Sequence, residues 1–348
     1  VWVLFFTIIF YLDPAFWYED YPISLVGRRQ SPINILSEKC ILNSKQMMFS
    51  PELVLSYPPS FCDLNIRNPK DHFYFGWRVD VPYDYGDKTG TDQYCHFVKL
   101  LLVPIEIAVL QGGPLNHRYK LIQFHAHWGK NCSCGSEHVI NNKHYSAEVS
   151  YYFSLLFVIL KSNFYSFILF TGTVKSLALL EAAINKDGLA VVAVLLDAVD
   201  GENCAKLESL ETICNMMTKI KYKGSPVRSI EKPLNILELL PENRSYYTYL
   251  GSLTTPPLWE TVTWIVFENP VKCRQEQVEN HSCSSNFAAL FYQPLVPFVF
   301  LQIDAFRQLL YYPRNEIEGL EDKYEANVEE NFRPVQPLNG RNVIYVKN

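Results

Sequence analysis

Residues 119–128 (YKLIQFHAHW) form the stretch that decides the fold. The run ends in alternation around two histidines, His125 and His127, and this pattern indicates a β-strand. Residues two apart in a strand project from the same face, so both imidazoles lie close together on one side. This is a metal-ligand spacing, because zinc accepts histidine nitrogen and a catalytic zinc site usually holds three protein ligands and a water. Alone, such a pair is a weak signal, since paired histidines are common.

The rest of the chain has the pattern of a β-rich domain. Residues 189–196 (LAVVAVLL) form a short apolar run, and residues 260–267 (ETVTWIVF) alternate polar and apolar like a half-buried strand. Helical periodicity is confined to short pieces, at about 204–219 and 304–310, and 21 prolines punctuate the chain. We therefore predict a mainly β (α+β) fold with short helices on its flank.

Composition excludes several classes of protein. The chain has 348 residues, of which 48% are hydrophobic, and this excludes a disordered chain of low hydrophobicity. Its formal net charge of −5 gives no basic footprint for nucleic acid. Nine scattered cysteines in a chain of this length do not fit a small disulfide scaffold and favour a reducing compartment. Nothing in the composition indicates a protein partner.

Apolar segments interrupt this pattern. Residues 1–12 (VWVLFFTIIFYL) are similar to a signal-peptide core but lack a basic region before it and a small-residue cleavage site after it. Residues 149–172 are long enough to span a bilayer, yet Lys161 and Asn163 near their middle are costly there. Two interpretations stay open for this second segment, which are a buried or surface insertion and translated non-coding sequence.

Eight short blocks together resemble the α-class carbonic anhydrases. They follow the order of that family over about residues 17–345. The blocks are 29–35 (RQSPINI), 112–115 (GGPL), 123–129 (QFHAHWG), 135–138 (GSEH), 145–148 (YSAE), 187–191 (DGLAV), 251–257 (GSLTTPP) and 331–338 (NFRPVQPL). The resemblance implies a single domain over 17–345 after an apolar segment at 1–16, which would be a signal remnant or non-native. Insertions would lie near 82–106, 149–172 and 279–303.

The resemblance also implies a fold and a reaction. The fold is a large central, mostly antiparallel twisted sheet with short flanking helices. The reaction is the reversible hydration of carbon dioxide to bicarbonate and a proton by hydroxide bound to Zn²⁺, which His125 and His127 would hold. Carbonic anhydrase is itself the reference case for zinc lowering the pKa of bound water to about 7. By position, the apolar wall that holds the substrate would comprise Val191, Leu253, Val262 and Trp264, with Thr255 on the substrate side.

Further roles follow from the same resemblance. Thr254 looks like the hydroxyl that orients zinc hydroxide, and Glu137 looks like the carboxylate that accepts its proton and fixes its direction. Gln123 and Glu148 resemble the groups that hold the free ring nitrogens of zinc-bound histidines. His138 resembles a buried structural histidine rather than a ligand.

The third zinc ligand is missing from this pattern. The family has histidine two residues after the position of Glu148, where this chain has Ser150. His144 on the connecting hairpin is a weak substitute. Cys132 and Cys134 offer another alternative, since with the two histidines they would form a closed, structural zinc site with two nitrogen and two sulfur ligands. The sequence therefore predicts two ligands of three and leaves the activity of the chain open.

The proton shuttle and the location of the protein are also open. The family position for a shuttle histidine is Phe75 here, and His72 is the nearby substitute. The cysteine pair common in secreted members is absent, because residues 21–27 contain no cysteine and Leu258 follows the Thr-Thr-Pro-Pro turn. This favours a cytoplasmic protein and leaves secretion possible. Two functions are then compatible with the sequence: a zinc-dependent carbonic anhydrase, and a carbonic-anhydrase-related binding protein without a complete zinc site.

Overall fold

The computed structural model describes residues 14–43, 52–57, 64–70, 76–81, 108–155, 183, 185–200, 207–275, 302–311 and 327–348. Several sequence predictions fall outside these ranges. They concern His72 and Phe75, the apolar residues 1–13, the segment 82–106, and most of the segments 149–172 and 279–303.

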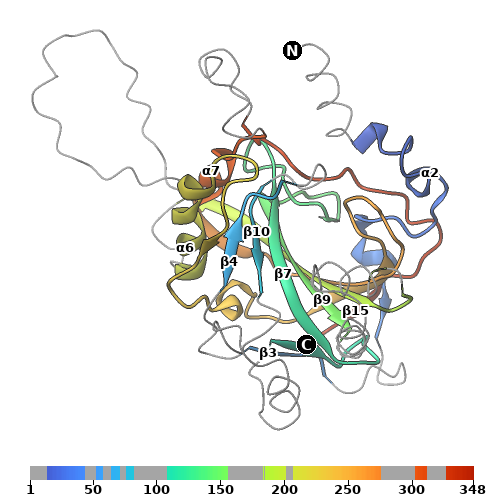
Figure 1. The fold of residues 1–348 in the computed structure, drawn as a ribbon. Helices are drawn as coiled ribbons and strands as arrows, with labels where there is room; N and C mark the ends of the chain where they lie inside the picture. The colour runs from blue at the N-terminus through green and yellow to red at the C-terminus, as the bar shows by residue number, and fades with distance from the viewer. Residues whose placement is uncertain are drawn as a thin grey trace, which may run out of the picture.

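A large sheet dominates the described part of the chain, with β7 and β9 side by side through its middle (Figure 1). Ten of its thirteen strands follow the order β11-β4-β5-β7-β9-β10-β13-β12-β15-β2, while β14 pairs with β10, and β6 joins β3 to β7. The strands are β2 (Ile41–Leu42), β3 (Val54–Ser56), β4 (Asn65–Arg67), β5 (Arg78–Asp80), β6 (Val109–Gln111), β7 (Tyr119–Trp128), β9 (Ala147–Leu155), β10 (Leu189–Asp200), β11 (Arg228–Ser229), β12 (Tyr246–Gly251), β13 (Val262–Phe267), β14 (Val271–Gln275) and β15 (Ile344–Val346). Most pairs are antiparallel, and β10–β13, β10–β14 and β15–β2 are parallel.

The predicted fold class is confirmed. The strand predicted over 119–128 is β7, the run 189–196 lies in the longer β10, and 260–267 contains β13. Within the described residues the helices are short, as predicted. They are α2 (Ile23–Val26), α6 (Glu208–Met216), α7 (Gln302–Arg307) and the 3-10 turns η1 (Pro14–Phe16), η2 (Ser37–Lys39), η3 (Met217–Ile220) and η4 (Ile236–Leu239). A separate two-stranded parallel sheet joins β1 (Asn34–Ile35) to β8 (Val139–Ile140).

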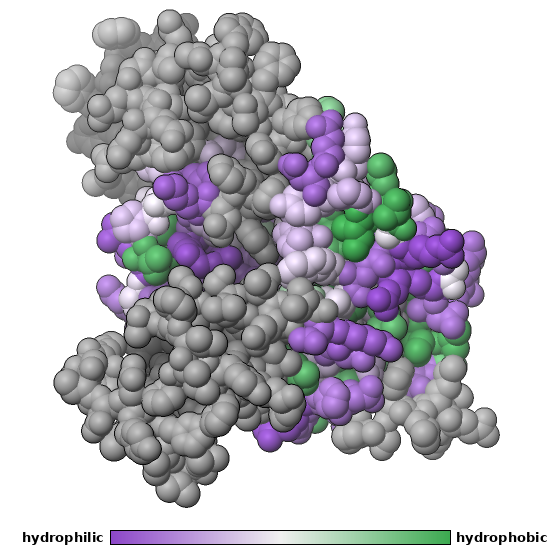
Figure 2. Space-filling view, turned by 45° about the vertical axis from the view of Figure 1, so that its right-hand side comes forward, coloured by the Kyte–Doolittle hydropathy of each residue, from purple (hydrophilic) through white to green (hydrophobic). Residues whose placement is uncertain are grey.

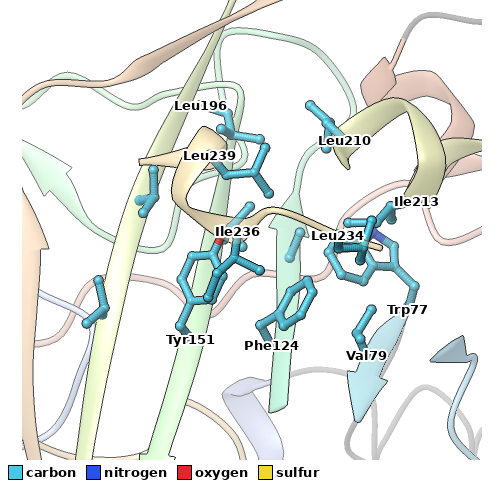
Figure 3. Close-up of a cluster of buried hydrophobic side chains, with 14 of the residues drawn as sticks. Trp77, Val79, Phe124, Tyr151, Leu196, Leu210, Ile213, Leu234, Ile236 and Leu239 are labelled. Carbon is cyan, nitrogen blue, oxygen red and sulfur yellow. The ribbon is translucent and has the colours of Figure 1, made fainter. Parts of the chain in front are cut away.

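The strand period of two divides the core between the two faces of the sheet. On one face, Phe124 and Tyr151 pack under α6 and η4, as Figure 3 shows. Phe306 of α7 packs on Trp77 there, with ring centroids 5.3 Å apart. The neighbouring residues of the same strands point to the opposite face. There Tyr152 shares a second buried cluster with residues of β10, β12 and β13.

The structure differs from the sequence prediction at β9. Residues 149–155 continue the strand, although they were predicted to begin an insertion. β9 pairs with β7 on one side and with β10 on the other, and Leu155 at its end lies opposite Tyr119. The reason is local, since Val149, Tyr151 and Phe153 face the α6 side while the residues between them face the other. This is the pattern of a strand buried on both faces.

In the described part of the chain, no helix has the length and apolar character needed to span a bilayer. The face in Figure 2 is largely hydrophilic where residues are described, with small apolar groups between polar ones.

Candidate active site

The two histidines of β7 converge inside the protein. His125 and His127 are 4% and 3% exposed, and their Nε2 atoms lie 3.2 Å apart. Two nitrogen ligands at about 2.0–2.1 Å from one tetrahedral zinc ion lie about 3.3 Å from each other. The two imidazoles therefore fit a shared zinc ion, as the strand spacing predicts. Burial, and then the neighbouring His127, hold the pKa of His125 well below its usual value.

The C-terminal part of the chain orients His127. The Nδ1 atom of His127 lies 2.9 Å from the carbonyl oxygen of Asn331, which can only accept a hydrogen bond. In the neutral imidazole, Nδ1 therefore carries the proton and the lone pair is on Nε2, the atom that faces His125. The Asn331 side chain ties the same segment to β7, because it accepts from the Trp128 backbone N–H and donates to the Ala126 carbonyl.

Glu137 lies beside this pair. Its carboxylate is 1% exposed, and its Oε2 atom is 3.3 Å from the Nε2 atom of His127. The backbone N–H of Arg333 donates to Oε1 at 3.0 Å. Burial raises the pKa of Glu137, and His127, the Arg333 N–H and the Thr254 hydroxyl oppose this only in part. Thr254 is thus a neighbour of Glu137, but its hydroxyl does not complete a hydrogen bond of good geometry, and the predicted pairing stays a prediction.

The predicted substrate wall is also brought together. Val191, Leu253, Val262 and Trp264 are buried in one cluster on the histidine face of the sheet. Thr255 follows Thr254 and is 8% exposed. Gln123, predicted to hold a ring nitrogen, is buried on the same strand, but its amide has no hydrogen-bond partner within the described residues. Its role stays a prediction.

Comparison with known proteins agrees with this arrangement. Residues 12–289 match the sequence model of one protein family, the eukaryotic-type carbonic anhydrases. The chain belongs to this family. Carbonic anhydrase 7 of Homo sapiens is 32% identical over 332 residues, which cover 94% of this chain and 92% of that protein. The mitochondrial carbonic anhydrase 5B of Rattus norvegicus is 30% identical over 335 residues, which cover 95% of this chain and 77% of that protein.

Glu148 has a different partner from the one that the family resemblance predicts. Its two carboxylate oxygens accept from the backbone N–H and from Nδ1 of His138, at 2.7 and 2.9 Å. His138 is fully buried and also contacts the Tyr249 hydroxyl at 2.7 Å, so it is a structural residue. Burial raises the pKa of Glu148, but the charge and hydrogen bonds of His138 outweigh this effect and lower it.

Ser150 occupies the place where the resemblance puts the third zinc histidine. It lies directly opposite His125 across β7 and β9, and it is fully buried. A serine hydroxyl is not among the usual zinc ligands of proteins, which are cysteine sulfur, histidine nitrogen and carboxylate oxygen. No group of three such residues suited to a metal ion occurs in the described part of the chain. Two donors therefore fit the zinc ion on which this family typically depends, and the set lacks a third.

The alternative ligands do not complete the set. Cys132 and Cys134 lie half-exposed in the turn after β7, where the Sγ atom of Cys134 contacts Asn131. The closed site with two nitrogen and two sulfur ligands is wrong, because these four residues, all of them in the described part of the chain, form no group that could hold a metal ion. His144 is exposed on its hairpin.

Sequence analysis missed three residues of the site. The carbonyl of Asn331 and the N–H of Arg333 contact the site from the block 331–338, whose match to the family was the only available signal. Tyr152 was missed because its strand was interpreted as an insertion. Its ring stacks on His125, with centroids 5.1 Å apart and planes at 29°.

Proposed function

We propose that this site carries out the zinc-dependent reversible hydration of carbon dioxide to bicarbonate and a proton. The observation that carries the proposal is the convergence of the His125 and His127 Nε2 atoms beside the buried Glu137. When zinc is bound there, it supplies a hydroxide nucleophile at neutral pH, the effect for which carbonic anhydrase is the reference case.

The residues of the chain would divide the remaining tasks. His125 and His127 would hold the ion, and the Asn331 carbonyl, which accepts from Nδ1 of His127, would leave the Nε2 lone pair of that ring available to it. A carboxylate at Glu137 would accept a hydrogen bond from the Thr254 hydroxyl and so direct the Thr254 oxygen lone pairs toward the nucleophile. The four apolar residues of the wall would exclude water from the position at which carbon dioxide binds.

The incomplete donor set supports a second candidate function. Without a third nitrogen, we expect zinc to bind weakly and hydration to be slow in the chain as it stands. Ser150 therefore favours a carbonic-anhydrase-related binding protein that keeps the fold and lacks a complete zinc site. The retained contact between Glu137 and His127 favours the enzyme instead, because a protein that only binds a partner has no physical need for it.

One experiment separates the two functions. Zinc affinity and carbon dioxide hydration are measured for the unchanged chain, for Ser150→His, and for Ser150→Gln. The glutamine variant is the matched control, since it adds a polar side chain of similar size without an imidazole. Outer partners of zinc ligands already change affinity by about 10–100-fold, so a restored ligand should tighten zinc by about 100-fold or more.

The outcomes are distinct. Gain of zinc and of hydration in Ser150→His, with neither in Ser150→Gln, supports the enzyme. Full activity of the unchanged chain would show that Ser150 does not limit the site. Tight zinc without hydration in Ser150→His, persisting after the Tyr152 ring beside His125 is also removed, would refute the proposed reaction and favour the binding protein. Removal of a donor by His127→Ala in the Ser150→His background should reverse the gain.

A further inference from the structure

Tyr152 lies between the histidines and the apolar wall. In the sheet it is opposite Gln123 of β7 and opposite Val191 of β10, so it shares their face. It is 1% exposed, and its ring stacks on His125 at 5.1 Å between centroids. The same buried cluster contains Val191, Leu253, Val262 and Trp264, the four residues of the predicted wall.

The buried ring of Tyr152 occupies space that a ligand would need. Protein interiors are filled to the density of organic crystals, so space taken by a buried ring is not available to a ligand. A small apolar molecule needs a gap between the metal-facing nitrogens and the wall. The aromatic ring of Tyr152 stands in this region, beside one of the two nitrogen donors and across from Val191.

We propose that Tyr152 fills the space beside His125 and thereby excludes small apolar molecules from the wall of the site. For the identity of the entering molecule, carbon dioxide, the inference rests on the proposed function. The filled space itself rests only on the position of the ring. Tyr152 is therefore a specificity-determining residue, and Ser150 and Tyr152 impair the site independently, one at the metal and one at the substrate.

Tyr151 provides a matched control. It is the same residue type on the same strand and is equally buried, but it faces the other side of the sheet. There its ring packs on Phe124, with centroids 5.3 Å apart, away from the histidines. Removing the Tyr151 ring leaves a comparable void on the face opposite the histidines. A loss of stability should therefore appear in both the Tyr151 and the Tyr152 variants, whereas entry of a small molecule beside His125 should appear only in the Tyr152 variants.

Xenon tests the filled space without any reaction. Apolar voids left by truncated core residues stay dry and bind xenon. In Tyr152→Val, xenon should shift the ring resonances of His125, whereas the unchanged chain, Tyr152→Phe and Tyr151→Val should leave those resonances in place. The phenylalanine variant separates the ring from its hydroxyl. Tyr152→Leu repeats the test with a smaller void if the valine variant folds poorly.

A kinetic test then connects the space to the reaction. In the Ser150→His background, Tyr152→Val should raise kcat/KM for carbon dioxide hydration by about tenfold or more, and Tyr151→Val should not. Xenon reaching His125 in the unchanged chain, or failing to reach it in Tyr152→Val and Tyr152→Leu, would overturn the inference. Xenon entry with tight zinc and no hydration would leave the inference standing and refute the proposed function.

Discussion

β7 and β9 lie side by side at the centre of the site but contribute to it unequally. β7 provides two buried imidazoles, and the one at His127 is held in a defined tautomer by Asn331. β9 is paired along its length on both sides, yet presents Ser150 and Tyr152 to the same face of the sheet as the histidines. The comparison teaches that backbone pairing tolerates almost any side chain that fits the face. The chemistry, in contrast, depends on the identity of single residues.

The largest expected effect concerns the part of β9 that still resembles the family. Glu148→Ala removes both acceptors of His138 inside the protein and should lower the free energy of unfolding by about 3–5 kcal/mol, the usual consequence of breaking a buried ion pair. Urea unfolding of both proteins measures this loss. Lys143→Ala is the control, because it breaks an exposed pair with Asp197 and should change little. Equal losses in the two variants would contradict the structural role of Glu148.

A smaller effect is expected where the C-terminal segment supports β7. Asn331→Ala removes two side-chain hydrogen bonds, to Trp128 and to Ala126, and should lower the free energy of unfolding by about 2 kcal/mol. Because the same segment orients His127, zinc affinity in the Ser150→His background should fall by about tenfold. Asn342→Ala is the control, because Asn342 also belongs to the C-terminal part of the chain but is exposed. Unchanged zinc affinity would show that His127 is oriented without this segment.

The sequence predicts those features of the fold and the site that depend on neighbouring residues, and it does not predict contacts between residues far apart in the chain. The period of two over 119–128 predicts β7 and the shared face of His125 and His127, because strand geometry is local. The apolar run 149–172 concealed β9, since both of its faces are buried and its strong hydrophobicity resembles an insertion. The contact of His127 with Asn331 could not be derived from spacing, because the two residues are 204 positions apart in the sequence. The place of Tyr152 depends on the same tertiary pairing.

A still smaller effect is expected at Ser150 itself. Within the described residues its buried hydroxyl has no hydrogen-bond partner, so Ser150→Ala should leave the free energy of unfolding unchanged or raise it by up to about 1 kcal/mol. Ser146 just before β9 is the matched control, since its hydroxyl donates to the Cys132 carbonyl and accepts from the Ala198 N–H. Ser146→Ala should therefore destabilise the protein. Destabilisation by Ser150→Ala as well would show that the Ser150 hydroxyl has a partner after all.

The last effect is confined to alkaline pH and concerns Tyr119 at the far end of β7. Tyr119, opposite Leu155, donates from its hydroxyl to the Asp187 carbonyl at 2.7 Å. Burial, and then Asp187, raise the pKa of Tyr119 from 10.0 to about 12. The folded state thus favours the neutral phenol, and this contribution to stability is complete below pH 10 and is lost as the pH rises toward 12. The stability difference between the unchanged chain and Tyr119→Phe should shrink over this interval in urea unfolding. A constant difference from pH 9 to pH 12 would mean that the hydroxyl is hydrated and that the Asp187 carbonyl does not hold it.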